Sequence, residues 1–540
     1  MITNSLPSSE ENAQFRRDVD RPFVPLTDAA LILGLQLLLL MFRLGYVPLL
    51  GPDEPRYARV AVEMARANTF VTPTLAGEVW LEKPPLYYWL AGLGFRAFGE
   101  NEWAARWPAV MAALLLTGAT GLFGARLFGS SAGRLAMLIA ATSPLTFAYG
   151  RVATMDMLVA GFATAATGLL LLRLLNIAGR LAIPAAWALM AVAFLAKGPI
   201  GFLIPLAIAV LWLALTSRLT FQATLSLFPP AGVLAGLIVA GPWVAAICVD
   251  QGWKFVEVFL LNHNLQRFTS TIHNHPGPFY YYVPVLLLGV FPWSGLAALA
   301  APVWSSVAGP RRSALVAWAL APLILFSLAG SKLPGYILPC VPPFAILLAL
   351  GASRTLLKPS VALRVAGLFG LIGAAVLAAL TARGVRAQEP WARSAVMPAI
   401  WLVATMFLAS RAFQSARNEV IRILSIGAAG FLLILTLVAP PVLEAMESGR
   451  RLFLPAEGRD VLVLGAWRTA WMAGYFYNDG RVKEVSTREA LLMIKAAPQL
   501  LLMGESESRE FGRSSELSVL QLAEGPRGNV LARVTMRAGR

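Results

Sequence analysis

Charged side chains crowd into residues 50–102, directly after the first long apolar run. An acidic pair, Asp53 and Glu54, lies near the start of this segment, and Glu82 and Lys83 lie further along it. Unpaired charges are costly in hydrocarbon, so the segment is expected at a water boundary or in a protein-walled cavity. A solvated linker with amphipathic helices explains its composition as well as a chemical site does.

A second polar segment, residues 250–282, contains all three histidines, His263, His273 and His275. Arg267 lies in the same segment, where polar and apolar residues recur at helical spacing. An amphipathic helix on the bilayer surface explains this pattern without any active site. The tyrosines that end the segment fit an interfacial belt equally well.

Isolated charges also stand at the expected ends of apolar runs. Lys332 and Tyr336 share a turn rich in Gly and Pro that is suited to binding an anion, although a lysine there can equally anchor a span at the interface. Asp156 and Lys197 are candidates for function because ionisable groups near hydrocarbon are costly. They can also simply neutralise each other.

Together, these segments supply the side chains of a lipid-phosphate site. Arginine and lysine bind phosphate through charge-assisted hydrogen bonds, and basic clusters beside a membrane bind anionic lipid head groups. Tyrosine and tryptophan can stack on a sugar ring or contact an isoprenoid tail. The residues concerned are the carboxylates Asp53, Glu54 and Glu82, the cations Arg56, Lys83, Arg267 and Lys332, and the aromatic residues Tyr57, Tyr87, Tyr88 and Trp89.

The composition of the whole chain indicates a membrane protein. Of its 540 residues, 57% are hydrophobic and 14% charged, with a mean hydropathy of +0.66, whereas soluble proteins carry about 25% charged residues. The net charge of +16 does not indicate nucleic-acid binding, because the arginines are mostly single or paired between apolar runs. The two cysteines, Cys248 and Cys340, fall in or beside apolar runs, so no disulfide framework is readable.

A helix needs about 20 mainly apolar residues to span a bilayer. The sequence predicts a mainly α, polytopic protein with thirteen candidate spans, at 28–49, 103–127, 131–149, 153–172, 182–196, 199–216, 226–248, 280–303, 313–330, 334–353, 361–381, 395–411 and 420–443. Twelve is the alternative count, because only Lys197-Gly198-Pro199 separates two of the runs. Residues 85–98 are shorter and predict a helix on the interface.

The short loops carry more Lys and Arg on one side of this topology, which predicts a cytoplasmic N-terminal tail, residues 1–27. The transmembrane domain, 28–443, then carries loops 50–102 and 249–279 on the far side of the membrane. Residues 444–540 follow on that side, and the runs 461–465, 481–486 and 499–503 predict strands of a small α/β domain. A stabilising cap is the favoured role for this domain.

Five motifs resemble, in the same order, those of the aminoarabinose (4-amino-4-deoxy-L-arabinose) transferases of lipid A. That family belongs to the C-type glycosyltransferases, with the oligosaccharyltransferases and protein mannosyltransferases. The resemblance runs from about residue 28 into the tail and weakens there. The motifs are Gly51-Pro52-Asp53-Glu54-Pro55-Arg56-Tyr57-Ala58, Glu82-Lys83-Pro84-Pro85, His263-Asn264-Leu265-Gln266-Arg267-Phe268, Tyr281-Tyr282-Val283-Pro284 and Lys332-Leu333-Pro334-Gly335-Tyr336-Ile337-Leu338.

The resemblance implies roles for individual residues. Asp53 matches the acidic residue at the reaction centre. Glu82 and His263 match positions where a divalent metal, such as zinc, is associated with the family. Lys83, Arg267 and Tyr336 match positions that bind the donor phosphate. Arg56 and Tyr57 match positions near that phosphate, and Asp156 and Lys197 match polar positions that line the cavity.

The implied function is transfer of a sugar, expected to be aminoarabinose, from a polyprenyl (undecaprenyl) phosphate to a phosphate of lipid A, with inversion. The implied location is the periplasmic face of the bacterial inner membrane, and a monomer that contacts membrane lipids is expected. A related transferase that glycosylates protein Ser or Thr, or another glycan, is the alternative. A polytopic transporter is a different class, but it should show internally repeated halves, which the sequence lacks.

Overall fold

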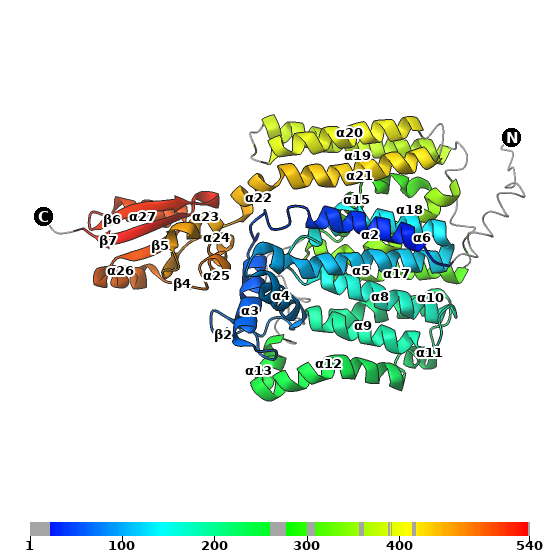
Figure 1. The fold of residues 1–540 in the computed structure, drawn as a ribbon, viewed down its shortest axis with the longest axis horizontal. Coiled ribbons are helices and arrows are strands. Elements are labelled where there is room, and N and C mark those ends of the chain that lie inside the picture. Colours follow the sequence, from blue (N-terminus) through cyan, green and yellow to red (C-terminus); the bar gives the residue numbers. More distant parts are fainter. Residues whose placement is uncertain are drawn as a thin grey trace, which may run out of the picture. The chain divides into compact units, whose positions relative to one another are not determined.

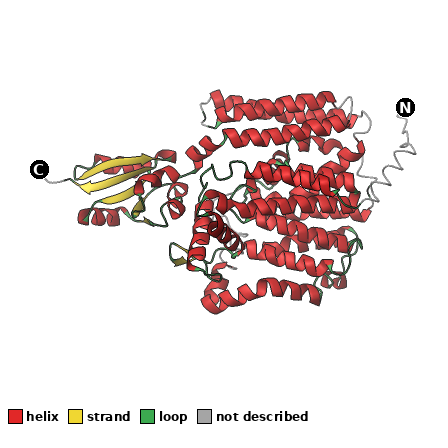
Figure 2. Cartoon of the chain, viewed as in Figure 1, coloured by secondary structure: helices red, strands yellow, loops and turns green. Residues whose placement is uncertain are grey.

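The computed structural model describes residues 22–259, 277–299, 307, 309–355, 361–386, 389, 391–412 and 417–537. Helices dominate these residues, and apart from one short hairpin the strands gather in the C-terminal segment (Figure 2). The chain forms two compact units. Unit 1 comprises Met1–Phe42, Ala109–Gly150 and Met155–Leu435, and unit 2 comprises Arg43–Pro108, Arg151–Thr154 and Thr436–Arg540.

Unit 1 is a bundle of apolar helices, in which α8 packs against α9 and α10, and α9 packs against α12 (Figure 1). Its helices are α2 (Leu26–Met41), α6 (Ser130–Ala141), α7 (Pro144–Tyr149), α8 (Asp156–Leu174), α9 (Ala182–Lys197), α10 (Ile200–Leu215), α11 (Phe221–Leu225), α12 (Pro230–Gln251), α13 (Trp253–Phe255), α15 (Tyr282–Gly289), α17 (Gly309–Leu328), α18 (Val341–Thr355), α19 (Val361–Arg386), α20 (Ala392–Ala412) and α21 (Arg417–Val438), with the 3-10 helices η2 (Trp293–Leu299) and η3 (Pro334–Cys340). Another helix, α5 (Glu102–Phe128), starts in unit 2 and continues into unit 1, and the last residues of α21 belong to unit 2.

Within the described ranges, seven helices are long and apolar enough to cross a membrane, and four apolar helices are shorter. The protein is therefore a multi-pass membrane protein, as predicted. The count of thirteen spans is not confirmed. One reason is that the run 131–149 is split at Ser143, whose side chain caps α7 while Pro144 occupies its first turn. Another is that the run 280–303 is divided between α15 and η2.

Small residues allow the bundle helices to approach closely. Gly168 on α8 faces the ring of Phe123 on α5, and a Cβ at this glycine would lie only 2.0 Å from the ring. Side-chain packing of this kind substitutes for the hydrophobic effect between helices in lipid, where apolar surface gains nothing by leaving the solvent.

The first part of unit 2 is the charged segment. It forms α3 (Asp53–Ala67), a hairpin of β1 (Thr74–Leu75) and β2 (Glu78–Val79), and α4 (Leu86–Phe98). The C-terminus of α3 is set by Asn68, whose φ of 52° is the left-handed conformation common at helix ends. With 13 residues, α4 is a helix as predicted, and at about 1.5 Å per residue it is too short to cross a bilayer upright.

The second part of unit 2 is an α/β fold with a five-stranded sheet in the order β4-β3-β5-β7-β6. The first three strands are parallel, and β7 and β6 continue the sheet antiparallel. The strands are β3 (Val461–Leu464), β4 (Val482–Glu484), β5 (Gln499–Met503), β6 (Leu517–Glu524) and β7 (Val530–Met536), and the helices are α22 (Pro440–Glu447), α23 (Arg450–Phe453), η4 (Leu454–Ala456), α24 (Arg468–Met472), α25 (Gly474–Tyr477), α26 (Thr487–Ala496), α27 (Glu505–Arg513) and η5 (Pro526–Gly528).

The centre of the sheet is buried on both faces, which explains why β3 reads as an unbroken apolar run. Leu462 and Leu464 face a core that includes Ile494 of α26, whereas Val461 and Val463 face a second core. Side chains alternate between the faces because the strand period is two. The three predicted strands are confirmed, and β6 and β7 were not foreseen.

Candidate active site

The two carboxylates that start α3 have opposite environments. Asp53 begins the helix with its side chain 44% exposed, whereas the side chain of Glu54 is 1% exposed. A helix N-terminus favours a carboxylate, because the first backbone N–H groups and the helix dipole present positive charge. The half-exposed Asp53 is therefore accessible from outside the protein, whereas Glu54 points into the protein interior.

Arg56 holds Asp53 from the next turn of α3. Its guanidinium donates to the Asp53 carboxylate and to the carbonyl of Pro52, the latter at 3.0 Å. The same guanidinium lies 5.4 Å from the ring centre of Trp80. The result is a half-exposed carboxylate beside a buried cation, an arrangement that can orient a polar reactant and an anion together.

The protonation states of this cluster follow from its charges. Burial opposes the charged form of Arg56, but Tyr57, Asp53 and Glu82 favour it, and the net result is a raised pKa. Burial raises the pKa of Tyr57 well above its ordinary value, and the Asp53 carboxylate raises it further. At neutral pH, Arg56 is therefore a cation and Tyr57 a neutral phenol.

Glu82 and Lys83 lie in the segment between the hairpin and α4. Lys83 is buried, and its ammonium donates to the carbonyl of Glu82 at 3.2 Å. Burial raises the pKa of Tyr88, and the charges of Glu82, Arg56 and Asp53 also act on it. The charges of both Asp53 and Glu82 also raise the pKa of Arg56, so the two predicted motifs of this segment lie within electrostatic range of the same side chains.

The three tyrosines predicted to meet the sugar or the lipid tail are buried. Tyr57, Tyr87 and Tyr88 pack on one another with ring centres 5.8–6.5 Å apart. The hydroxyl of Tyr87 donates to the carbonyl of Ala105 at 3.0 Å. Tyr87 is thus part of the support that joins α4 to α5.

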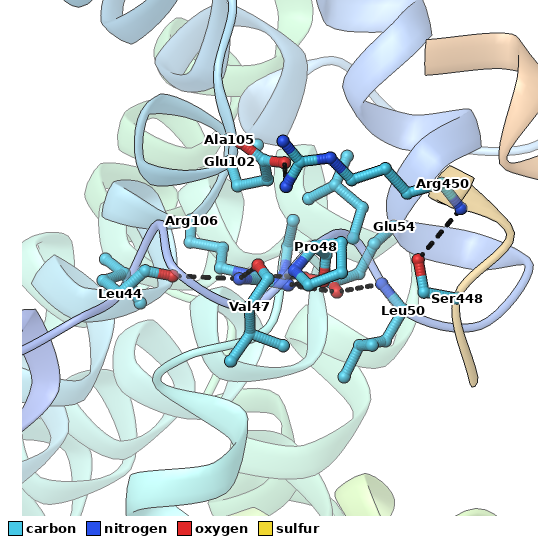
Figure 3. Close-up of polar contacts among 12 residues, drawn as sticks. Leu44, Val47, Pro48, Leu50, Glu54, Glu102, Ala105, Arg106, Ser448 and Arg450 are labelled. Carbon is cyan, nitrogen blue, oxygen red and sulfur yellow. Dashed lines mark hydrogen bonds and ion pairs between the residues drawn. The ribbon is translucent and has the colours of Figure 1, made fainter. Parts of the chain in front are cut away.

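Arg106, near the start of α5, anchors the segment that precedes Asp53 (Figure 3). It forms two hydrogen bonds with the Glu54 carboxylate, at 2.9 and 2.8 Å. Its remaining N–H groups donate to three backbone carbonyls, those of Leu44, Val47 and Pro48, at 2.6–2.9 Å. Buried charges are tolerated only when paired and fully hydrogen-bonded, and this arginine meets both conditions.

Glu54 also fixes the short segment Arg151–Thr154, because it accepts the N–H of Ala153 at 2.5 Å. Burial and the neighbouring Arg106 lower the pKa of Arg151 to about 10, which still leaves it charged at neutral pH. Through Glu54, the structure therefore places a second, partly buried arginine near the start of α3.

Among the predicted residues of unit 1, Asp156, Lys197 and Tyr336 lie together. Lys197, the last residue of α9, donates to the carboxylate of Asp156, the first residue of α8. Its ammonium also lies 4.7 Å from the ring centre of Tyr336 in η3. The mutual neutralisation left open by the sequence does occur, in contact with an aromatic ring.

Lys332 is buried at the end of α17. Its ammonium donates to the carbonyls of Ser327 and Ala329, at 3.0 and 2.7 Å, and so satisfies the C-terminus of that helix. The turn that follows packs tightly, because a Cβ on Gly335 would lie 2.4 Å from the ring of Tyr149. The predicted contact of Lys332 with a phosphate stays a prediction.

Arg267 and His263, with His273 and His275, fall outside the described residues. Within the ranges that are described, no three His, Cys, Asp or Glu side chains are grouped as metal ligands. Glu82 alone therefore does not make a metal site, and the predicted pairing of Glu82 with His263 stays a prediction.

Sequence reasoning missed Arg106, Arg151, Tyr477 and Asp479. The signal for Arg106 was available, since an arginine inside an apolar run suggests a specific partner. Nothing in the sequence pattern marked Tyr477, which binds the N–H of Leu49, or Asp479, which binds Arg59, because each of these partners lies more than 400 positions away.

The model of the dolichyl-phosphate-mannose-protein mannosyltransferase family matches residues 82–245. An undecaprenyl phosphate-alpha-4-amino-4-deoxy-L-arabinose arabinosyl transferase of Edwardsiella ictaluri is 34% identical over 356 residues, 63% of each chain. One from Sodalis glossinidius is 36% identical over 333 residues, 59% of this chain and 58% of that one. The chain thus spans less than two thirds of the length of these curated relatives.

The crystal structure of ArnT from Cupriavidus metallidurans bound to undecaprenyl phosphate matches with a TM-score of 0.77 at 23% identity. The match covers 93% of this chain and 97% of that one. The apo structure of the same protein gives a TM-score of 0.76. The chain has this fold, and the resemblance to the aminoarabinose transferases is confirmed in both sequence and fold.

Proposed function

We propose that this protein is a glycosyltransferase that moves aminoarabinose from a polyprenyl phosphate to lipid A. Support comes from the arabinosyl transferases that it resembles in sequence and from the fold that it shares with a protein crystallised with undecaprenyl phosphate. The observation that carries the proposal is the cluster at the start of α3, where a half-exposed Asp53 is held by the buried cation Arg56.

In the proposed reaction, an acceptor oxygen attacks the anomeric carbon of the sugar. The bond from that carbon to the donor phosphate breaks, and the polyprenyl phosphate leaves with the electron pair. Fixed cations in a water-poor site stabilise the charge that develops on the leaving oxygen. Arg56 and Lys83 are the proposed cations of unit 2, and a single displacement inverts the configuration of the sugar.

The role of Asp53 depends on the acceptor. A phosphate of lipid A is already ionised at neutral pH, so Asp53 would orient the reactants and balance charge. A hydroxyl acceptor needs a general base within hydrogen-bond reach, and Asp53 would supply it. The roles predicted for Asp156, Lys197, Lys332, Tyr336 and Arg267 in donor binding are part of the same proposal.

Glu82 and His263 are the two proposed protein ligands of a divalent metal. Two protein ligands are fewer than the three of a typical catalytic zinc site, so other ligands would have to complete the shell. The metal would act as a Lewis acid toward phosphate oxygens.

The bacterial inner membrane is the proposed location. The loop that carries Asp53 and the C-terminal segment would face the periplasm, and the N-terminus would face the cytoplasm. The bias of Lys and Arg among the short loops supports this orientation.

The test is transfer by the purified full chain in lipid bicelles, with polyprenyl-phosphate aminoarabinose and lipid A as substrates. Mass spectrometry should show lipid A gaining one aminoarabinose with the wild type and none with Asp53→Asn. Lipid A from cells with and without the gene should show the same difference. Absence of the added sugar with an intact wild-type protein would refute the proposal.

A second candidate is transfer of a sugar to protein Ser or Thr, favoured by the match to the protein mannosyltransferase family over residues 82–245. The same bicelles with Ser- and Thr-containing peptides as acceptors separate the two. Modified peptides together with unmodified lipid A would favour this second function.

A further inference from the structure

Tyr477, at the end of α25, contacts the segment that leads into the candidate active site. Its hydroxyl accepts the backbone N–H of Leu49 at 2.7 Å and donates to the carboxylate of Glu102 at 3.0 Å. Burial raises the pKa of Tyr477, so the hydroxyl keeps its proton and can donate and accept at once. Arg450 approaches the same Glu102 carboxylate at 3.4 Å (Figure 3).

Three consecutive backbone amides just before Asp53 are fixed in this way. The N–H of Leu49 is bound by Tyr477, and the N–H of Leu50 by the Glu54 carboxylate at 2.7 Å. The N–H of Gly51 donates to the carbonyl of Glu447 at 2.9 Å. Two of the three acceptors thus belong to the C-terminal part of the chain, and Gly51 adopts the left-handed φ of 62° that glycine tolerates.

A second contact holds the middle and the C-terminal end of α3. The Asp479 carboxylate accepts hydrogen bonds from Arg59 and from Arg66, two turns further along the same helix. Burial opposes the charge of Asp479, but these bonds lower its pKa. Arg59 also donates to Glu63 at 2.6 Å, and Glu63 accepts from the hairpin at Thr74 and Ala76.

From this geometry we propose that the C-terminal α/β segment positions Asp53, with Tyr477 and Asp479 as positioning residues. Tyr477 and Glu447 fix the backbone that enters α3, and Asp479 fixes the direction of the helix. The inference rests on the proposed function in one respect, namely that Asp53 acts in the reaction. The role proposed here for the C-terminal segment is therefore a catalytic one that acts through α3, in place of the stabilising cap expected from the sequence.

A cap and a positioning element differ in what their loss changes. Loss of a cap lowers stability and leaves the turnover of the remaining folded protein unchanged. Loss of a positioning contact lowers kcat in folded protein, since a misplacement of about 1 Å at a reaction centre can reduce the rate on the order of 10²-fold. Donor binding through Lys83 should be little affected, so KM for the donor should stay nearly constant.

The experiment compares Tyr477→Phe and Asp479→Asn with the wild type, as full chains in bicelles. Tyr477→Phe removes only the hydroxyl, and we expect kcat to fall about tenfold with KM for the donor changed less than about twofold. Hydrogen–deuterium exchange should rise in the peptide that covers residues 49–57. Asp479→Glu, which keeps the charge, should restore part of the activity lost in Asp479→Asn.

The matched control is Glu505→Gln, which breaks an exposed ion pair with Arg509 in the same α/β segment. It should leave both kcat and the exchange of residues 49–57 unchanged. A wild-type protein that transfers no sugar would refute the proposed function, while the exchange data would still report on the anchoring. Unchanged exchange in Tyr477→Phe, or raised exchange with unchanged kcat, would overturn the positioning role.

Discussion

Glu54 and Arg106 form a buried ion pair with two hydrogen bonds, and their side chains are only 1% and 2% exposed. Glu54 directly follows the half-exposed Asp53 in α3. The two adjacent carboxylates therefore have different environments and different roles. The first carboxylate faces outward, and the second connects α3, α5 and the Arg151–Thr154 segment. Two neighbouring carboxylates can take different roles when burial separates them.

Removing one member of this pair should destabilise the protein. Arg106→Met leaves Glu54 buried without its cation, and removal of one partner of a buried pair typically costs about 3–5 kcal/mol. We expect a marked fall in the apparent melting temperature, and a smaller fall for the double variant Glu54→Gln/Arg106→Met. Arg134→Met, which breaks the more exposed pair with Asp28, is the control. A double variant no more stable than Arg106→Met would contradict this account.

Asp53→Asn should abolish sugar transfer while expression and melting temperature stay close to wild type. The side chain is half-exposed, so the amide fits the same space, but it is neither a base nor an anion. Asp460→Asn, at an exposed position in the α/β segment, is the control. Near-normal transfer by Asp53→Asn would remove this residue from the reaction centre.

Lys83→Ala and Arg267→Ala should weaken binding of the polyprenyl-phosphate donor, because each removes a cation assigned to the phosphate. Loss of a charge-assisted hydrogen bond is typically worth about 1.5–3 kcal/mol, or roughly 10- to 150-fold in the dissociation constant. Isothermal titration with donor lipid measures this change. Lys332→Ala should lower stability as well, since its ammonium binds the end of α17. Donor binding unchanged in both Lys83→Ala and Arg267→Ala would argue against phosphate capture.

Acid should loosen the contact between α3 and the C-terminal segment. The folded pKa values of Asp479 and Glu63 are lowered from the ordinary values of 3.8 and 4.5. A carboxylate with a lowered folded pKa adds stability above its unfolded pKa, and that stability is lost as the pH falls through the folded value. The melting-temperature difference between wild type and Asp479→Asn should therefore be full at pH 7 and shrink below about pH 4. A difference that does not depend on pH would exclude this electrostatic anchor.

Metal content tests the predicted pairing of Glu82 with His263. If the pair binds a divalent ion, purified wild-type protein should carry about one equivalent of zinc or another divalent metal, and Glu82→Ala should carry much less. Elemental analysis by mass spectrometry gives both values. Wild-type protein without metal after mild purification would end the hypothesis.

The sequence by itself determined the membrane class, the strands β3, β4 and β5, and the residues that open α3. These features depend on local patterns: long apolar runs, short β-branched or leucine-rich runs, and charges that hydrocarbon excludes. The five ordered motifs also identified the family that the chain resembles. Local patterns cannot show, however, which of two adjacent carboxylates turns inward.

Only the tertiary structure decided that Glu54 is buried against Arg106, that Tyr87 supports α5, and that Lys332 binds a helix end. It also decided that Tyr477 and Asp479 bind the segment that carries Asp53. Each of these outcomes depends on partners distant in sequence, which are selected by packing and by the need to pair every buried polar group. Because that requirement applies to the folded chain as a whole, no short stretch of the sequence shows which partners are chosen.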